Sequence, residues 1–411
     1  MGWLRLFLAI GVAVNHSPGW HTSMFMDGTL CVQSFYIVSG FLIQFIVSSY
    51  LEQHHGVRKF YGARALRIFP LYWIVAGVWE LWLGNPSAAQ AWHERQLLPI
   101  VTSVFTNIFL FGQDALRFFF YDTSTHRFWL LPAGLQTLDG VIGGNLHLAN
   151  FVNTLGQSWS MALELTFYVL APWLLRLRNR WVAVIVIWSF ILRLTLSYFG
   201  YNGQSWINAF FPQEVGIFLL GALSCRFYRS YIESGRWHGW IQDRAPWLPS
   251  SAPAFISLIV VLYWETQGRQ LWQPGEVHLF PLRWYQAHQA LPLGWWVTLF
   301  TVVIALPFLF DYSRSSKLDR WVGELSYPVY LNHILVLVAL QQFGFVADWM
   351  TVPSFAVMVA VPMLLCVDRP LERLRHRYLR SPNSANKGHV TAYPLNLASK
   401  DYRLLWQCRA R

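Results

Sequence analysis

The sequence predicts an all-α, polytopic integral membrane protein. Of its 411 residues, 55% are hydrophobic and only 12% are charged, whereas a soluble protein of this size carries about twice that share of charge. Several apolar stretches approach the roughly 20 residues that a membrane-spanning helix needs. The basic residues stand in short runs between these stretches, as they do in cytoplasmic loops. The net charge of +11 therefore indicates membrane topology, and we expect no nucleic-acid partner.

Eleven apolar segments are candidates for membrane helices. They lie at residues 3–22, 28–50, 67–83, 97–112, 158–175, 181–199, 206–228, 251–264, 293–310, 325–345 and 352–367. Five runs of Lys and Arg mark the loops between them that the positive-inside rule assigns to the cytoplasm. These runs are Arg58, Lys59, Arg64 and Arg67; Arg176, Arg178 and Arg180; Arg226, Arg229 and Arg236; Arg314, Lys317 and Arg320; and Arg369 to Arg380.

The basic runs are incompatible with eleven crossings. If every segment spanned the membrane, the run at 176–180 and all later runs would face outward. Omitting one segment between 83 and 158 restores them, and 97–112 is the segment to omit because it is short and contains Thr102, Ser103, Thr106 and Asn107. We therefore predict about ten transmembrane helices, with both termini in the cytoplasm and the chain in the inner (plasma) membrane. Segment 97–112 is predicted to be re-entrant or interfacial, buried in protein.

The expected domain organisation is simple. Residues 1–380 form one membrane-embedded domain, and residues 381–411 form a polar cytoplasmic tail. The four cysteines are scattered, with no Cys-x-x-Cys pair and no metal-ligand spacing, so no metal site is predicted. They are Cys31, Cys225, Cys366 and Cys408.

Polar residues inside the apolar segments are the candidates for function, because charge at membrane depth is costly. Arg5 and His16 are eleven residues apart, which places them on one helix face about 16 Å apart along the axis. Arg64 and Arg67, spaced i, i+3, share a face at the cytoplasmic start of a helix, and Pro70 is expected near that start. Glu164 lies inside a helix, about two turns from its outer end.

Two further stretches continue the pattern. "VGELSYPVYLNHILV" places Tyr330, Asn332 and His333 inside a helix, and "VDRPLERL" begins with an acidic residue, Asp368, near the cytoplasmic end of the last helix. In "FYIVSGFLI", Ser39 and Gly40 are small residues that permit close approach of a neighbouring helix.

Together these motifs resemble the acyltransferase-3 family of multi-spanning membrane O-acyltransferases. Six family patterns occur in the family's order: Arg5-x10-His16, the second-helix SGF, the R-x-x-R-x-x-P of Arg64, Arg67 and Pro70, the W-S-x-x-x-E of Trp159 to Glu164, the S-Y-x-x-Y-L-x-H that ends at His333, and an acidic-x-P at Asp368. Three positions depart from the patterns. Tyr36 replaces a usual Phe, Cys31 stands where Gly is common, and Asp368 replaces Glu; we expect no chemical effect from Tyr36 or Asp368.

The resemblance implies an enzyme that moves an acyl group, acetyl being the expected one, from acyl-CoA to a hydroxyl of a carbohydrate, glycolipid or other envelope or secreted acceptor. No permanently bound cofactor is expected. Arginines suit the phosphates of the donor, so Arg5, Arg64 and Arg67 are its predicted ligands. His16 is the predicted general base, and Glu164 could orient it, stabilise its charge or bind acceptor hydroxyls.

The predicted site leaves several alternatives open. Tyr330, Asn332 and His333 are unranked candidates for an oxyanion donor, and His333 could instead be a core residue. Arg5 could reach lipid phosphates, Arg64 and Arg67 could only anchor topology, and Glu164 could be a helix–helix hydrogen bond. A proton-coupled secondary transporter is the competing functional class, although no internal repeat is visible. A non-catalytic scaffold is a third, weaker alternative.

Overall fold

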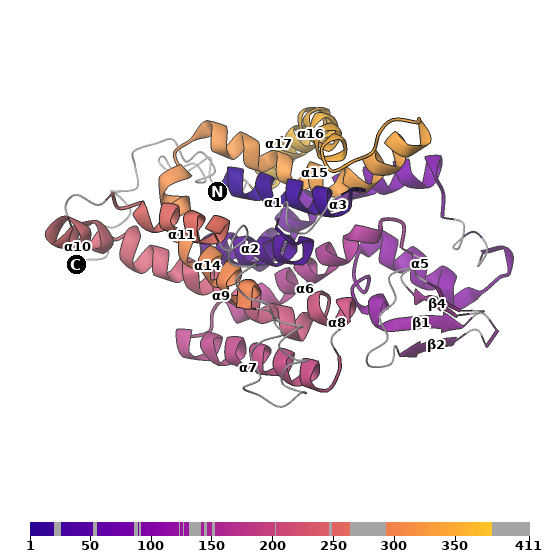
Figure 1. Cartoon of the computed structure of the whole chain (residues 1–411), viewed down its shortest axis with the longest axis horizontal. Helices are drawn as coiled ribbons and strands as arrows, with labels where there is room; N and C mark the ends of the chain where they lie inside the picture. Colours follow the sequence, from indigo (N-terminus) through magenta and orange to yellow (C-terminus); the bar gives the residue numbers. More distant parts are fainter. Residues whose placement is uncertain are drawn as a thin grey trace.

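The computed structural model describes residues 1–379 except 20–25, 52–55, 86–88, 90–91, 123, 126, 131–140, 144–145, 150–152, 202, 246–248 and 264–292. Its helices run largely along the long axis of the molecule, with α7 on one side and α16 and α17 on the other (Figure 1). The predicted tail at 381–411 lies outside the described residues.

Helices account for most of the described chain. The α-helices are α1 (Gly2–Asn15), α2 (Gly28–Leu51), α3 (Gly56–Trp82), α5 (Leu97–Phe109), α6 (Trp159–Leu174), α7 (Asn179–Tyr198), α8 (Gln204–Asn208), α9 (Phe211–Phe227), α10 (Arg236–Arg244), α11 (Ala252–Tyr263), α14 (Leu293–Ser313), α15 (Lys317–Gln342), α16 (Thr351–Met363) and α17 (Arg369–Leu379). Shorter helical turns are η1 (Ala115–Phe118), η3 (Gly156–Ser158), η4 (Tyr228–Ile232) and η6 (Leu364–Asp368).

The structure is that of a multi-pass membrane protein. Within the described ranges, six helical segments are long and apolar enough to cross a bilayer: Gly28–Val47, Asn179–Tyr198, Ser205–Ile232, Trp295–Ser313, Lys317–Gln342 and Thr351–Leu374. All eleven apolar segments of the sequence carry helix. The number of ten crossings stays a prediction.

Two predicted helix boundaries were wrong. The first helix ends at Asn15, well short of residue 22, and its 14 residues span about 21 Å, less than the roughly 30 Å hydrocarbon core. His16, at its C-terminal end, therefore does not lie in mid-helix. Helix α3 begins at Gly56, eleven residues before the apolar segment at 67, so Pro70 lies in its interior and not near its start.

Helices α1 and α15 run parallel, which is the relative direction that the parity argument predicts. At one end, Asp319 of α15 accepts hydrogen bonds from the backbone N–H groups of Gly2 (2.8 Å) and Trp3 (3.1 Å), and thereby caps α1. Fourteen residues further along each helix, His16 meets His333. With eleven crossings the two helices would be antiparallel, so the contacts support the omission of one segment.

Glycines allow the closest helix contacts. A Cβ atom built on Gly40 would lie 1.8 Å from the carbonyl oxygen of Phe218, and one on Gly221 would lie 1.9 Å from that of Ile37. Helices α2 and α9 therefore pack backbone to backbone at these two positions. The close approach predicted for Gly40 is confirmed, and it fixes α2 in the centre of the bundle.

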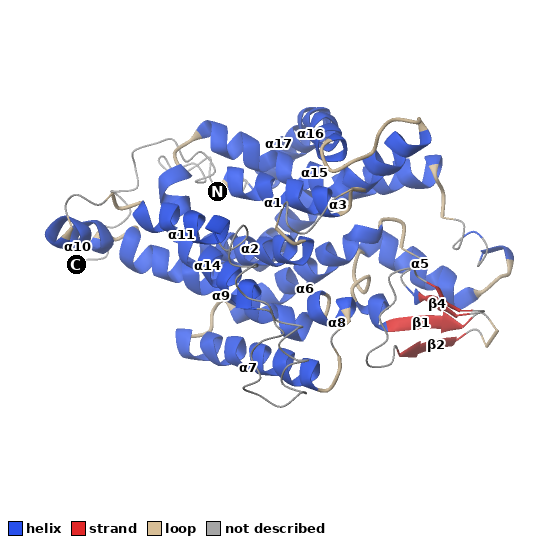
Figure 2. Cartoon of the chain, viewed as in Figure 1, coloured by secondary structure: helices blue, strands red, loops and turns tan. Residues whose placement is uncertain are grey.

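A small antiparallel sheet adds β structure that the all-α prediction lacked. Its strands are β1 (Phe119–Asp122), β2 (Arg127–Leu130), β3 (Val141–Gly143) and β4 (Leu146–Leu148), in the order β2-β1-β4-β3. They lie beside α5 at one end of the molecule (Figure 2). The alternating pattern of "FFYD" is only four residues long, which is too short to signal a strand in an apolar chain.

Helix α5 occupies the segment that was predicted not to cross. It has 13 residues, and only Pro99 and Thr106 are buried. The apolar face that carries Val101 and Phe105 is exposed, so the expected burial in protein was wrong. The polar face packs inward: Asn107 accepts a hydrogen bond from the backbone N–H of Thr154 at 2.9 Å. Such an amphipathic helix suits an interfacial position, and that position stays a prediction.

Candidate functional site

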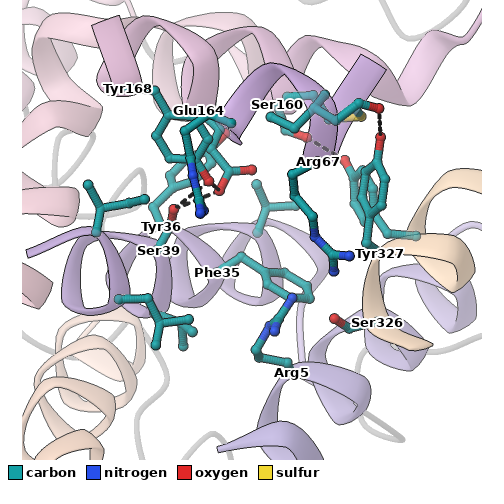
Figure 3. Close-up of a pocket in the computed structure, with 18 residues that line it drawn as sticks. Arg5, Phe35, Tyr36, Ser39, Arg67, Ser160, Glu164, Tyr168, Ser326 and Tyr327 are labelled. Atoms are coloured by element: carbon teal, nitrogen blue, oxygen red, sulfur yellow. Dashed lines mark hydrogen bonds between the residues drawn. The ribbon is translucent and has the colours of Figure 1, made fainter. Parts of the chain in front are cut away.

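A cavity of about 190 Å³ lies among five helices, α1, α2, α3, α6 and α15. Its polar walls come from Arg5 of α1, Ser39 of α2, Arg64 and Arg67 of α3, Glu164 and Tyr168 of α6, and Tyr327 and Tyr330 of α15. Figure 3 labels six of these side chains, which converge from helices that are distant in sequence: Arg5, Ser39, Arg67, Glu164, Tyr168 and Tyr327. The structure therefore brings five predicted site residues, Arg5, Arg64, Arg67, Glu164 and Tyr330, to one cavity.

Arg67 is held by a carboxylate. Its Nη1 atom lies 2.5 Å from Oδ2 of Asp368, the acidic residue of the terminal motif, and its guanidinium lies 5.7 Å from the ring centroid of Tyr327. The Tyr327 hydroxyl donates to the carbonyl of Ile68 at 2.6 Å. Two sequence motifs about 300 residues apart thus form one ion pair, which ties the end of the membrane domain to α3.

Unlike Arg67, neither Arg64 nor Arg5 forms an ion pair with an acidic residue in the part of the chain that the structure describes. The Nε atom of Arg64 is buried without a hydrogen-bond partner, and its guanidinium lies 6.0 Å from the ring centroids of both Phe60 and Tyr168. No side-chain hydrogen bond or ion pair joins Arg5 to any residue that the structure describes. These two cations can therefore accept an anionic ligand without breaking a contact.

Glu164 pairs with hydroxyls and not with His16. Ser39 donates to its Oε1 atom at 2.6 Å, and the Tyr168 hydroxyl donates to the same atom. No hydrogen bond or ion pair connects Glu164 to His16 among the described residues. The alternative of a helix–helix hydrogen bond, here between α2 and α6, matches this geometry.

The far end of the cavity is defined by Tyr330. Its hydroxyl donates to the carbonyl of Gln157 at 3.0 Å and lies 2.5 Å from the hydroxyl of Ser160. Gln157 donates in turn to the carbonyl of Leu331 at 2.9 Å. These bonds lock the start of α6 against α15, so the Trp-Ser motif fixes the position of the Tyr330 ring.

His16 and His333 meet just beyond Tyr330. Their ring centroids are 5.0 Å apart, and Nε2 of His333 lies 3.3 Å from Nδ1 of His16. His333 is fully buried, whereas the side chain of His16 is exposed. Asn15 fixes the adjoining turn, because its side chain donates to the carbonyl of Met26 at 2.9 Å and accepts from the N–H of Gly28 at 2.8 Å.

The hydrogen-bond partners determine the tautomers of this pair. Nδ1 of His333 lies 2.7 Å from the carbonyl oxygen of Tyr330, and Nδ1 of His16 lies 2.9 Å from that of Val12. Carbonyl oxygens only accept, so each Nδ1 carries the proton. Nε2 of His333 then accepts from His16, and Nε2 of His16 keeps its lone pair. That atom is the basic nitrogen a general base requires.

Asn332 faces away from the cavity. Its amide donates to the carbonyl of Ala356 at 3.1 Å and contacts the sulfur of Met363, so it joins α15 to α16. Sequence reasoning missed Ser160, Tyr168 and Tyr36 as cavity residues. Ser160 lies within the quoted W-S-x-x-x-E motif and Tyr168 lies one helical turn after it, at positions whose roles only the packing of α2 and α15 reveals.

Comparison with known proteins agrees with this assembly. A family model described as an acyltransferase domain matches residues 1–368. The chain belongs to the acyltransferase-3 family. Nodulation protein 10 of Rhizobium leguminosarum bv. viciae is 24% identical over 399 residues, which cover 90% of this chain and 92% of that protein. No solved structure matches the chain. Five of the six sequence motifs in this membrane acyltransferase lie wholly within the matched range. The sixth, the acidic-x-P motif, begins at Asp368, which is the last matched residue.

Proposed function

We propose that this acyltransferase moves an acyl group, most simply acetyl, from acyl-CoA to a hydroxyl of a carbohydrate or glycolipid acceptor. The observation that carries the proposal is a single cavity with unpaired arginines at one end and a histidine pair just beyond the other. The arginines can bind a donor that carries several phosphates. The histidine pair can activate a hydroxyl.

The donor is proposed to enter from the cytoplasmic side, where coenzyme A is made. Arg5 and Arg64 bind its phosphates, while Arg67 is held by Asp368 and shapes the wall. The cavity volume of about 190 Å³ is below the roughly 300–1,000 Å³ of pockets that enclose whole drug-sized ligands. It suits the narrow acyl-pantetheine end, with the nucleotide outside it. The distance of about 16 Å from Arg5 to His16 is comparable to the length of that arm.

The transfer step is proposed to occur at His16. Its Nε2 atom takes the proton of the acceptor hydroxyl while the hydroxyl oxygen attacks the thioester carbon. The carbon–sulfur bond then breaks, and the coenzyme A thiolate leaves and takes up the proton. His333 positions His16 and accepts from its Nδ1–H, which favours the imidazolium as it forms. Tyr330, of the three oxyanion candidates, lines the cavity and is the proposed donor to the oxyanion, once its single hydroxyl proton turns from the carbonyl of Gln157 toward the substrate.

The transporter alternative has no specific observation in its favour. The buried charged pair closest to a proton-relay arrangement is Arg193–Glu214, at 2.5 Å. Arg193 also donates to the carbonyl of Ile207 at 2.7 Å, and Gln33 donates to Glu214 at 3.2 Å. Both charges are thus matched by protein groups in the core of α2, α7 and α9.

The test is turnover by the purified protein in lipid nanodiscs. The protein is mixed with radiolabelled acetyl-CoA and extracted envelope glycans or glycolipids, and free thiol and labelled acceptor are measured together. We expect acceptor-dependent thiol release matched by label in the acceptor fraction. Absence of both turnover and acetyl-CoA binding would reject the proposal. Binding of longer acyl-CoA in place of acetyl-CoA would change only the acyl group.

A further inference from the structure

A second arginine site lies next to the cavity wall that Ser160 and Tyr330 form. Arg117 belongs to η1, in the outer segment between α5 and α6. Its guanidinium lies 4.8 Å from the ring centroid of Trp159, the residue that precedes Ser160 in the Trp-Ser motif. Trp159 therefore supports Arg117 on one side while Ser160 holds Tyr330 on the other.

Arg117 is partly buried and has unused hydrogen-bond donors. Its Nε atom is buried without a partner, and no residue in the described part of the chain pairs with its guanidinium. Burial lowers the pKa of Arg117 from its ordinary value, but arginine stays charged at neutral pH. Stacking on Trp159 contacts the face of the guanidinium and leaves the N–H groups at its edge unmatched. An unmatched buried donor is costly, and a bound anion would remove that cost.

Tyr36 supplies a second unmatched donor in the same region. Its side chain is 3% exposed and lines the cavity, yet its hydroxyl has no hydrogen-bond partner. The ring stacks on Phe218 at a centroid distance of 4.4 Å, so a phenylalanine would pack there without leaving a polar atom buried. Figure 3 shows Tyr36 on the wall formed by α2. From the sequence we expected the Tyr36 hydroxyl to have no chemical effect. In the structure it makes no hydrogen bond, so packing alone does not explain why Tyr and not Phe stands here.

The two donors flank Tyr330. Arg117 stacks on Trp159, and the neighbouring Ser160 hydroxyl lies 2.5 Å from that of Tyr330. Phe35, next to Tyr36 in α2, has its ring centroid 6.3 Å from that of Tyr330. The His333 ring centroid lies 5.8 Å from the same ring. Arg117 thus stands at the histidine end, where the acceptor hydroxyl must approach. The donor phosphates would lie at the other end with Arg5 and Arg64, so Arg117 is not needed for coenzyme A.

We propose that Arg117, assisted by the Tyr36 hydroxyl, binds an oxyanion carried by the acceptor, so that the enzyme selects acidic acceptors. The shared chemistry is a carboxylate, as in a uronic acid, or a phosphate, as in a sugar phosphate. An arginine edge can hold either one bidentately. The inference rests on the proposed function, because it assumes that the histidine end receives the acceptor.

Acceptor binding is tested without turnover. Saturation-transfer NMR on the protein in nanodiscs compares glucose, glucuronic acid and glucose 6-phosphate at equal concentrations. We expect at least one of the two acids to bind more tightly than glucose. Arg117→Gln should lower that affinity by roughly tenfold, the loss expected for one charge-assisted hydrogen bond. Tyr36→Phe, which keeps the ring and its packing, should cause a smaller loss. Carboxylate and phosphate sources are separated by which acid binds.

The matched control is Arg127→Gln, which removes an exposed arginine from β2 in the same outer segment and should change nothing. Acetyl-CoA affinity should be unchanged in Arg117→Gln. Equal binding of glucose and both acids by the wild type, or an equal loss of all three ligands in Arg117→Gln, would overturn the inference. Selective binding of an acid without acetyl transfer would reject the proposed function and leave the anion site standing.

Discussion

Two regions of the bundle bury arginine in opposite ways. In the core formed by α2, α7 and α9, Arg193 is 2% exposed and is matched by Glu214, the carbonyl of Ile207 and the ring of Trp295 at 5.1 Å. In the cavity, Arg64 is partly buried, lies 6.0 Å from the ring centroids of Phe60 and Tyr168, and pairs with no carboxylate among the described residues. Both arginines lie in segments where charge is costly.

The difference separates structural charge from functional charge. A buried arginine whose guanidinium pairs with a carboxylate has its charge matched by the protein, so it needs no ligand and fixes helix positions, although the Nε atom of Arg193 itself has no hydrogen-bond partner. An arginine beside a cavity whose guanidinium pairs with no carboxylate is stabilised when an anion arrives, so it is a binding group. Arg67 belongs with the first group through Asp368, although the sequence placed it with the second. The variants below are ordered by the size of the effect that this distinction predicts.

The largest effect is expected from the base, His16. His16→Ala should slow acetyl transfer, measured as kcat, by about 10²–10⁴-fold, the contribution typical of general acid–base catalysis, because no other described cavity residue offers a free imidazole nitrogen. Acetyl-CoA affinity, measured by equilibrium binding, should stay unchanged because the arginines remain. His238→Ala, which removes an exposed histidine from α10, is the control. Near wild-type transfer by His16→Ala at equal expression would reject His16 as the base.

The contact between His16 and His333 allows a second test, in which His333 is replaced. His333→Gln keeps a side-chain acceptor near Nδ1 of His16, whereas His333→Ala removes it. If His333 positions His16, the glutamine variant should retain more kcat than the alanine variant, with equal KM for the donor. Equal loss in both would mean that the imidazole of His333 itself acts on substrate.

The next effect concerns stability at the matched pair. Arg193→Ala leaves Glu214 buried without its cation and should lower the free energy of unfolding by about 3–5 kcal/mol. Replacing both residues by apolar ones, Arg193→Met with Glu214→Leu, should recover most of that loss. Thermal unfolding in detergent measures both. A double variant that is stable but cannot transfer acetyl groups would show that this pair has a functional role.

A smaller effect is expected for Arg64. Arg64→Gln should weaken acetyl-CoA binding by roughly tenfold or more, because one charge-assisted contact to phosphate contributes about 1.5–3 kcal/mol. Its thermal stability should change little, since it loses no ion pair. Arg67→Gln should show the reverse, a loss of stability from the unpaired Asp368 with a lesser change in affinity. Arg58→Gln, an exposed arginine in the same helix, is the control. If Arg64→Gln and Arg67→Gln changed donor affinity and thermal stability equally, the distinction between a binding arginine and a structural arginine would be rejected.

The sequence predicted the class of the molecule and the residues around the cavity better than it predicted their partners. Composition and charge runs required a helical membrane protein, and the parity of the basic loops predicted that α1 and α15 run parallel. Contacts between distant segments could not be read in the same way. Asp368 pairs with Arg67 and His333 meets His16 because of helix packing that no local pattern encodes.

The small sheet and the unpaired side chains of Arg117 and Tyr36 also could not be predicted from the sequence. Strands β1 to β4 have three or four residues each, too few for periodicity to reveal them. The unpaired donors of Arg117 and Tyr36 were invisible for another reason. An arginine in a loop next to a membrane segment looks like a solvated charge until the structure shows it covered by Trp159.

The smallest effect is expected at Glu164, and it separates the sequence hypothesis from the structure. If Glu164 oriented His16, Glu164→Gln would slow the transfer step strongly, because a charge next to the base would be lost. In the structure Glu164 accepts from Ser39 and Tyr168, and the amide oxygen of Gln can accept from both. We therefore expect a turnover rate close to that of the wild type and a stability change of about 1 kcal/mol or less, the scale of one neutral hydrogen bond. Donor affinity should be equal or slightly higher, because removing a negative charge near Arg64 favours phosphate.

The opposite result would assign Glu164 to the catalytic step. That result is a loss of about two orders of magnitude or more in turnover, the scale of general acid–base catalysis, at unchanged stability. The cavity carboxylate would then have the role that the sequence suggested.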